Sequence, residues 1–322
     1  MEVNSKNIKL WSTLGPRASL GLGILDLAKY QKDLIVVTCD VSTSAGLDRF
    51  RKSLPNQYID LGIAEQNMIG VATGLANEKF KVITTTFAPF QTMRCCEQIK
   101  VNLGYMQEKI TMIGLASGLV LGNLGFTHCC IEDLGVLRSI PNLCIISPAD
   151  SLETLKAIES SIHNKNSCYI RVTGGTNNPI IYKEDYKFEI GKAIRLKEGN
   201  DITIFGSGAV LNDCMIVSEH LKSKKISAGV INVHTIKPID KEIIVDASEK
   251  SKLIVTVEEH NKIGGLGSSV SEVISSIKNA PRQLTLGIND SYTKSGSYKF
   301  LKNYYRLVSE KILEDILKML NE

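Results

Sequence analysis

One acidic side chain, Glu65, stands where a short extended segment and a glycine turn give way to a predicted helix over residues 64–78. Gly70 and Gly74 follow with helical spacing and allow close packing against a neighbouring element. A carboxylate in a first helical turn is favoured by the helix dipole alone, so an ordinary surface residue is one interpretation. The other interpretation is an acid–base group at the mouth of a ligand site.

Two aromatic residues, Phe87 and Phe90, follow a predicted strand over residues 81–85. Core packing would explain them, but open α/β sheets bind ligands at this end of their strands, where two rings can stack on a planar ligand. His128 follows a glycine-rich loop over residues 118–125, a setting that suits hydrogen bonding or acid–base catalysis. The other histidines lack such a setting and are expected to be structural or solvated: His163, His220, His234 and His260.

The composition describes an ordinary globular protein of 322 residues with 43% hydrophobic residues and a net charge of +4. This weak charge, without a basic stretch, argues against nucleic acid or a membrane surface as partner. We expect no membrane span and no signal peptide, and therefore a cytoplasmic location. The eight cysteines are expected to be buried reduced thiols, with a zinc site near His128 as the alternative.

Short β-branched runs alternate with longer helical patterns along the chain. In the first half, strands are expected at residues 34–38, 81–85, 110–113, 143–146 and 168–172. Helices are expected between them at residues 16–30, 64–78, 89–104, 130–139 and 150–163. The second half has expected strands at 202–205, 228–231, 253–257 and 284–286, and a closing helix at 306–320.

This alternation predicts an α/β protein with two domains. A doubly wound, mostly parallel-sheet domain is expected over residues 1–175, a linker over 176–190, and a smaller α/β domain over 191–322. Glycine clusters at 206–208 and 264–267 follow predicted strands, but neither has the third glycine of a dinucleotide-binding loop. Tight turns are therefore the simpler interpretation of both clusters.

Several segments occur together in a fixed order: GIAEQNM, TFAPFQTMR, GFTHCCIEDLGVLRSIPN, ISPAD, YIR, HTIKPID and EEHNKIGGLG. In this order they resemble the transketolase family over nearly the whole chain. The resemblance implies a domain that binds the pyrimidine ring of thiamine diphosphate, followed by the transketolase C-terminal domain. The stretch IEDLGVLRSIPN is most similar to the C-terminal subunit of split transketolases.

In this family, a GDG motif on a separate N-terminal domain holds the diphosphate of the cofactor and its Mg²⁺, and no GDG occurs in this sequence. The resemblance therefore implies an N-terminal partner subunit that carries the motif and most of the Mg²⁺ ligands. It also implies an α2β2 heterotetramer with a β–β contact. The implied reaction transfers a two-carbon ketol unit from a ketose or ketose phosphate to an aldose acceptor.

The resemblance assigns cofactor contacts residue by residue. Glu65 corresponds to the catalytic glutamate that hydrogen-bonds N1′ of the pyrimidine, and Ile63 to the wedge that bends the cofactor. Met93 stands where the family has a third aromatic residue of the pyrimidine pocket. The full set of implied cofactor contacts is Asp40, Ile63, Glu65, Phe87, Phe90 and Met93.

Substrate contacts follow in the same way. Arg17, Ser44 and Arg171 correspond to a set that binds substrate phosphate, which the fork of an arginine suits. His128 corresponds to the catalytic histidine near C1 of the donor. Leu124 stands where the family has an aspartate that holds a substrate hydroxyl, so this departure predicts a changed substrate pocket and an unusual acceptor.

Two alternatives stay open. The chain could be the β subunit of a 2-oxo acid dehydrogenase E1 or a carboligase resembling 1-deoxyxylulose-5-phosphate synthase, against which the motif around His128 argues. It could also be a scaffold subunit without chemistry of its own. The joint presence of Glu65, Phe87, Phe90 and His128 argues against a scaffold.

Overall fold

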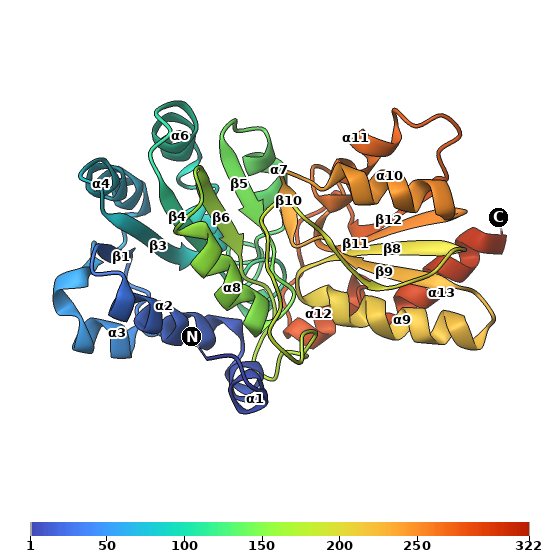
Figure 1. The fold of residues 1–322 in the computed structure, drawn as a ribbon, viewed down its shortest axis with the longest axis horizontal. Helices are drawn as coiled ribbons and strands as arrows, with labels where there is room; N and C mark the ends of the chain where they lie inside the picture. The colour runs from blue at the N-terminus through green and yellow to red at the C-terminus, as the bar shows by residue number, and fades with distance from the viewer. Residues whose placement is uncertain (1, 322) are drawn as a thin grey trace.

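The structure is a computed structural model that describes residues 2–321 and contains two α/β units side by side (Figure 1). The first unit contains a seven-stranded sheet and the second a five-stranded sheet. Both sheets are mostly parallel with helices on their faces, so the predicted fold class is confirmed. No helix within residues 2–321 is long and apolar enough to cross a bilayer.

The first sheet is parallel except at one edge. Its strands are β1 (Leu34–Thr38), β2 (Tyr58–Asp60), β3 (Lys81–Phe87), β4 (Ile110–Leu115), β5 (Leu143–Ile146), β6 (Ser167–Arg171) and β10 (Thr235–Lys237). They lie in the order β10-β5-β6-β4-β3-β1-β2, and β10 pairs antiparallel with β5. Because β10 comes from the second half of the chain, the two expected domains share this sheet.

Helices cover both faces of this sheet (Figure 1). They are α1 (Ser5–Leu14), α2 (Pro16–Tyr30), α3 (Asp48–Ser53), α4 (Glu65–Asn77), α5 (Ala88–Gln91), α6 (Cys96–Gln98), the π-helix η2 (Ile99–Tyr105), α7 (Asp133–Arg138) and α8 (Ser151–Ser161). Leu20 of α2 and Ile158 of α8 belong to the core on one face, and Met68 of α4 and Leu137 of α7 to the core on the other. This arrangement places α4 and α7 on the same side of the sheet.

The second unit repeats this construction on a smaller scale. Its strands are β7 (Ile194–Lys197), β8 (Ile202–Ser207), β9 (Ala228–Asn232), β11 (Leu253–Asn261) and β12 (Arg282–Ile288), in the order β12-β11-β8-β9-β7. Its helices are α9 (Leu211–Ser223), α10 (Lys241–Lys250), α11 (Leu266–Ile274), α12 (Tyr298–Tyr304) and α13 (Ser309–Asn321). Side chains of α10 and α11 share one core cluster with α7 and β5, so the units are joined by a continuous apolar core.

The linker is fixed rather than loose. Residues 176–190 form no helix or strand, but the carboxylate of Asp150 accepts the N–H groups of Ile181 and Tyr182 at 2.9 and 3.0 Å. Asp150 also caps α8 through the N–H of Glu153 at 2.8 Å. Burial raises the pKa of Asp150 to about 6. The expected linker therefore packs against α8 and ties the two units together.

The strands predicted from sequence are present, but one predicted helix is interrupted in the structure. The expected helix over residues 89–104 is three pieces, α5, α6 and η2, with a break at residues 92–95. Pro89 lies in the first turn of α5, and the hydroxyl of Thr92 bonds back to the carbonyl of Ala88, which competes with helical pairing. Arg94 lies in this break and pairs with Glu65, the first residue of α4.

His234 lies between the two units and titrates outside its ordinary range. Its ring is fully buried against Phe188, with centroids 4.3 Å apart, and burial lowers its pKa to about 4 despite the opposing charge of Asp240. In an unfolded chain the pKa of a histidine is about 6.5. Between this pH and about 4, the histidine is therefore protonated in the unfolded state and neutral in the folded state. Stability contributed by neutral His234 is thus lost as pH falls from about 6.5 towards 4.

We predict that His234→Asn removes this loss. The quantity to measure is the unfolding free energy of the variant minus that of wild type, from urea titrations. This difference should be about 2 kcal/mol more favourable to the variant at pH 4.5 than at pH 7.5. The exposed His220→Asn variant is the matched control and should follow wild type at both pH values. An equal stability gap between wild type and His234→Asn at both pH values would contradict the prediction.

Candidate active site

Glu65 is the first residue of α4, and the turn before it is built by the carboxylate of Asp60. One oxygen of Asp60 accepts the N–H groups of Asp40 and Gly62 at 2.9 and 3.0 Å. Gly62 has φ +66°, a conformation that glycine adopts without strain. The turn leaves the Glu65 side chain only 4% exposed although it lies at the carboxyl edge of the sheet, where ligands bind.

The carboxylate of Glu65 pairs with Arg94. The Nη1 atom of Arg94 lies 2.7 Å from Oε2 of Glu65, and the guanidinium lies over the ring of Phe90 with 4.1 Å to its centroid. A buried carboxylate needs such a partner because it has lost its water. Arg94 was missed by sequence reasoning; the sequence shows only that an arginine follows Phe90 by four residues, and its contact with Glu65 is visible only in the structure.

Phe87, Phe90 and His128 form one group of rings, the aromatic cluster. The ring centroids of Phe87 and Phe90 are 6.4 Å apart, and those of Phe90 and His128 are 5.3 Å apart, both with edge-on geometry. His128 also meets Phe87 at 6.2 Å. Three predicted site residues from two distant segments are thus brought together, next to the pair of Glu65 and Arg94.

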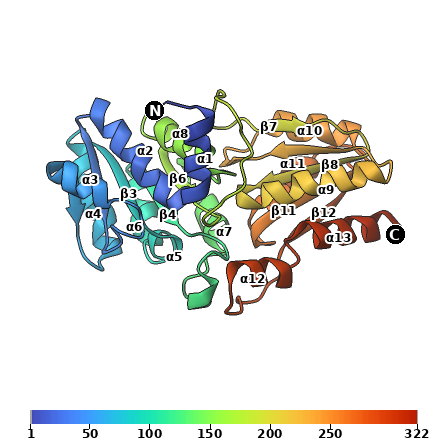
Figure 2. The ribbon, with the colours of Figure 1, turned by 90° about the horizontal axis from the view of Figure 1, so that it is seen from below.

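The loop that carries His128 is held by the second unit. The N–H of Leu119 donates to Oε1 of Glu259 at 2.7 Å, and the hydroxyl of Tyr298 donates to the other carboxylate oxygen at 2.6 Å. A Cβ at Gly118, whose φ is +69°, would lie 2.3 Å from Glu259. Figure 2 shows the tip of this loop, the short helix η3 (Gly122–Leu124), beside α12.

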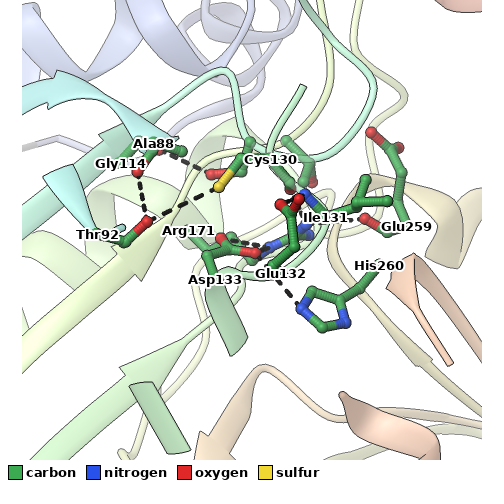
Figure 3. Close-up of polar contacts among 12 residues, drawn as sticks. Ala88, Thr92, Gly114, Cys130, Ile131, Glu132, Asp133, Arg171, Glu259 and His260 are labelled. Carbon is green, nitrogen blue, oxygen red and sulfur yellow. Dashed lines mark hydrogen bonds and ion pairs between the residues drawn. The ribbon is translucent and has the colours of Figure 1, made fainter. Parts of the chain in front are cut away.

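Arg171, predicted to bind phosphate, lies in a buried network instead (Figure 3). Its side chain is 1% exposed, and its Nε atom lies 2.8 Å from Oδ2 of Asp133. Its Nη2 group donates to the carbonyls of Cys130 and Glu259 at 3.1 and 2.8 Å. Burial alone would lower the pKa of Arg171, but the Asp133 carboxylate raises it above its ordinary value. The structure thus separates Arg171 from the predicted phosphate contacts and gives it protein partners.

His260 belongs to the same network, as Figure 3 shows. It is fully buried, its Nε2 atom lies 3.7 Å from Oδ1 of Asp133, and burial lowers its pKa to about 4. Glu258 next to it accepts the N–H groups of Leu266 and Gly267 at the start of α11. Burial raises the pKa of Glu258 to about 7. These groups support the junction of the two units and lie outside the aromatic cluster.

Arg17 and Ser44, the other predicted phosphate contacts, line one pocket of about 290 Å³. Segments at 14–18, 43–46 and 174–176 surround it. Burial lowers the pKa of Arg17, and within residues 2–321 its guanidinium has no hydrogen-bonded or ionic partner. A half-buried guanidinium without a partner in a pocket is able to bind an anion.

The remaining predicted site residues are exposed. Ile63 is 77% exposed and Leu124 is 56% exposed, and Met93 is also largely accessible. Asp40 is exposed and has φ +55°.

The residues present fit a planar nitrogen ring. The aromatic cluster offers ring faces and edges, and Glu65 offers a carboxylate oxygen, Oε1, that no other side chain of residues 2–321 engages. Within the same residues, no group of three or more His, Cys, Asp or Glu side chains is arranged to hold a metal ion. The chain therefore offers a carboxylate oxygen and aromatic rings that suit a planar nitrogen ring, and no metal site of its own within residues 2–321.

Comparison with known proteins accounts for both units. Residues 14–176 match the transketolase pyrimidine-binding domain, and residues 191–312 match the transketolase C-terminal domain. These matches define the class of the chain as a pyrimidine-binding domain joined to the C-terminal domain that accompanies it.

Relatives of similar length agree with this class. A protein described as a transketolase C-terminal section from Methanocaldococcus jannaschii is 36% identical, with 94% of this chain and 96% of the relative covered. One of the subunits of an apulose-4-phosphate transketolase from Phocaeicola vulgatus is 35% identical, with 93% and 95% covered. A split-gene transketolase, solved as an inactive β4 tetramer, superposes with a TM-score of 0.88 at 30% identity, with 96% of this chain and 99% of that chain covered.

The chain belongs to the transketolase family. Within it, the chain corresponds to the C-terminal subunit of a split transketolase, one part of a two-chain enzyme. The alternative of a 2-oxo acid dehydrogenase subunit or a related carboligase is not favoured by these relatives.

The pair of Asp133 and Arg171 gives a stability prediction. Asp133→Ala leaves Arg171 buried without its counter-ion, which costs about 3–5 kcal/mol in buried pairs. We expect a loss of this size in the unfolding free energy, measured by urea titration at pH 7.5. The matched control is Glu272→Ala, which removes the exposed partner of Arg138 and should cost less than about 1 kcal/mol. Equal losses in both variants would show that the buried pair does not support the fold.

Proposed function

We propose that this subunit supplies the pyrimidine side of a thiamine-diphosphate site and that an N-terminal partner subunit supplies the diphosphate side with Mg²⁺. The observation that carries the proposal is the buried Glu65 carboxylate beside the aromatic cluster, with one oxygen paired to Arg94 and the other free for a ligand. Ile63 and Met93, both exposed at the rim, are proposed to complete the ring contacts, with Asp40 close to the cofactor.

Each residue of the site has a separate proposed task. Glu65 shares a proton with a ring nitrogen of the pyrimidine and orients the ring through Oε1. Phe87 and Phe90 hold the ring by edge and face contacts and exclude water from it. When bound, thiamine diphosphate supplies the electron sink for the ketol carbanion. His128, edge-on to Phe90, is proposed to hydrogen-bond or protonate a donor oxygen.

The proposed substrates are sugars or sugar phosphates. Arg17 and Ser44 are the proposed phosphate contacts; that they share a pocket and that Arg17 has no partner within residues 2–321 supports this. Arg171 would act indirectly, by holding the backbone of the loop before α7 through the Cys130 carbonyl. Leu124 presents an apolar surface on that loop, which supports an acceptor with few hydroxyls at that point.

The proposed assembly is an α2β2 heterotetramer in the cytoplasm. A β4 tetramer of the split-gene relative is inactive, which supports the need for a second kind of subunit. The described cysteines are free thiols, mostly buried, as expected for a reducing compartment. The proposed partner is an N-terminal transketolase subunit with a GDG motif.

We predict that the purified chain is folded but does not catalyse ketol transfer. Adding an N-terminal transketolase subunit from the same genome, thiamine diphosphate and Mg²⁺ should give transfer from hydroxypyruvate or a ketose phosphate to an aldose. Coupled assays on the chain, the partner and the mixture provide the measurement, with a mixture containing Glu65→Ala as control. Turnover by the chain alone, shown free of partner by mass spectrometry, would contradict the proposal.

We predict that Leu124 sets acceptor preference. Leu124→Asp adds a hydrogen-bond acceptor and should raise kcat/KM for ribose 5-phosphate relative to a deoxy-sugar acceptor by about tenfold. Phe126→Leu, which changes a neighbouring exposed apolar residue without adding a polar group, is the matched control. If wild type already prefers ribose 5-phosphate and the Asp variant does not improve on it, Leu124 does not select the acceptor.

A further inference from the structure

We propose that Arg94 is the positioning residue of Glu65: it fixes one carboxylate oxygen and leaves the other to meet the ring. This inference rests on the proposed function, because it gives Arg94 a task only where Glu65 acts on a bound ring. Arg94 then acts through Glu65 and needs no contact with substrate.

The first support is that the two partners differ in their exposure to solvent. Glu65 has a side chain that is 4% exposed, whereas the side chain of Arg94 is 41% exposed. Within residues 2–321, Arg94 is the one side chain that forms a hydrogen bond or ion pair with this carboxylate. A single charge-assisted hydrogen bond to Oε2 therefore sets the orientation of the carboxylate plane. The same bond thereby sets the position of Oε1, which has no partner among the side chains of residues 2–321.

The second support is that Arg94 is itself held. Its guanidinium lies over Phe90 at 4.1 Å, a cation–π contact, and its backbone N–H donates to the carbonyl of Pro89 at 3.3 Å. Arg94 lies in the break at residues 92–95 that interrupts the expected helix. The break therefore has a functional consequence, because it places the guanidinium between Phe90 and α4.

The third support is the chemistry of arginine. A guanidinium is planar, so it can stack on a ring and donate in its own plane to a carboxylate at the same time. A lysine would keep the charge but would lose the stacking and the fixed direction. Lysine should therefore restore only part of what alanine removes.

A competing hypothesis makes the opposite prediction. The guanidinium over Phe90 also resembles a planar ring with N–H donors, so Arg94 could occupy the place of the pyrimidine and have to leave before the cofactor binds. Removing it would then strengthen cofactor binding. A positioning residue instead lowers turnover with little change in affinity.

The test uses the two-chain enzyme with Arg94→Ala, Arg94→Lys, Glu65→Gln and the double variant Glu65→Gln/Arg94→Ala. Calorimetry gives the Kd for thiamine diphosphate, and coupled assays give kcat at saturating cofactor. Arg94→Ala should lower kcat about 10- to 100-fold and change Kd less than about threefold, with partial recovery in Arg94→Lys. Glu65→Gln should lose about 10²–10⁴-fold, and the double variant should lose no more, because Arg94 acts through Glu65.

Arg51→Ala, which removes an exposed arginine paired with Asp48, is the matched control and should leave both quantities unchanged. Unchanged kcat in Arg94→Ala beside an impaired Glu65→Gln would overturn the positioning role alone. Losses that multiply in the double variant, or tighter cofactor binding in Arg94→Ala, would also overturn it. Full activity of Glu65→Gln would overturn the proposed role of Glu65 together with this one.

Discussion

The ion pair between Arg171 and Asp133 is the constraint on which the rest of the structure depends. Both side chains are almost completely buried, at 1% and 0% exposure, so their charges are tolerable only while they stay together. Arg171 ends β6, Asp133 begins α7, and the same guanidinium binds backbone carbonyls before α7 and on β11. One side chain thus holds together the end of β6, the loop before α7 and strand β11 of the second unit.

This constraint explains how distant segments form one site. Glu259 of the second unit holds the loop that carries His128, and that loop brings the histidine to Phe90. Glu65 follows the turn that Asp60 stabilises, and it pairs with Arg94, which lies in the break after α5. The ring side of the site is therefore held by several contacts, whereas Ile63, Met93 and Leu124 are exposed. The second unit therefore holds the loop that carries His128 through Glu259.

The sequence predicted the fold well because both the strand runs and the order of motifs are strong signals. Glu65, Phe87, Phe90 and His128 lie together as the residue pattern and the resemblance suggested, although their chemical roles stay predictions. The short β10 was not predicted, since three residues carry no periodicity and their pairing with β5 is made across the domain boundary.

The differences between the expected and the observed surroundings of the site residues have physical causes. Arg171 corresponds in sequence to a phosphate contact, but burial and the charge of Asp133 give it another partner, and neither is visible in a linear motif. The expected helix over residues 89–104 overlooked the effect of Pro89 and of the Thr92 hydroxyl on its first turns. Arg94 could not be paired with Glu65 from sequence, because the contact depends on that break.

The central claim is that Glu65, oriented by Arg94, receives the pyrimidine ring at an interface with a second subunit. A crystal structure of the two-chain complex with thiamine diphosphate tests it most directly. The account predicts a ring nitrogen within about 2.6–3.2 Å of Glu65 Oε1, Arg94 still bonded to Oε2, and the diphosphate and Mg²⁺ held by the partner subunit. A cofactor bound away from Glu65, or held with its metal by this chain alone, would contradict the account.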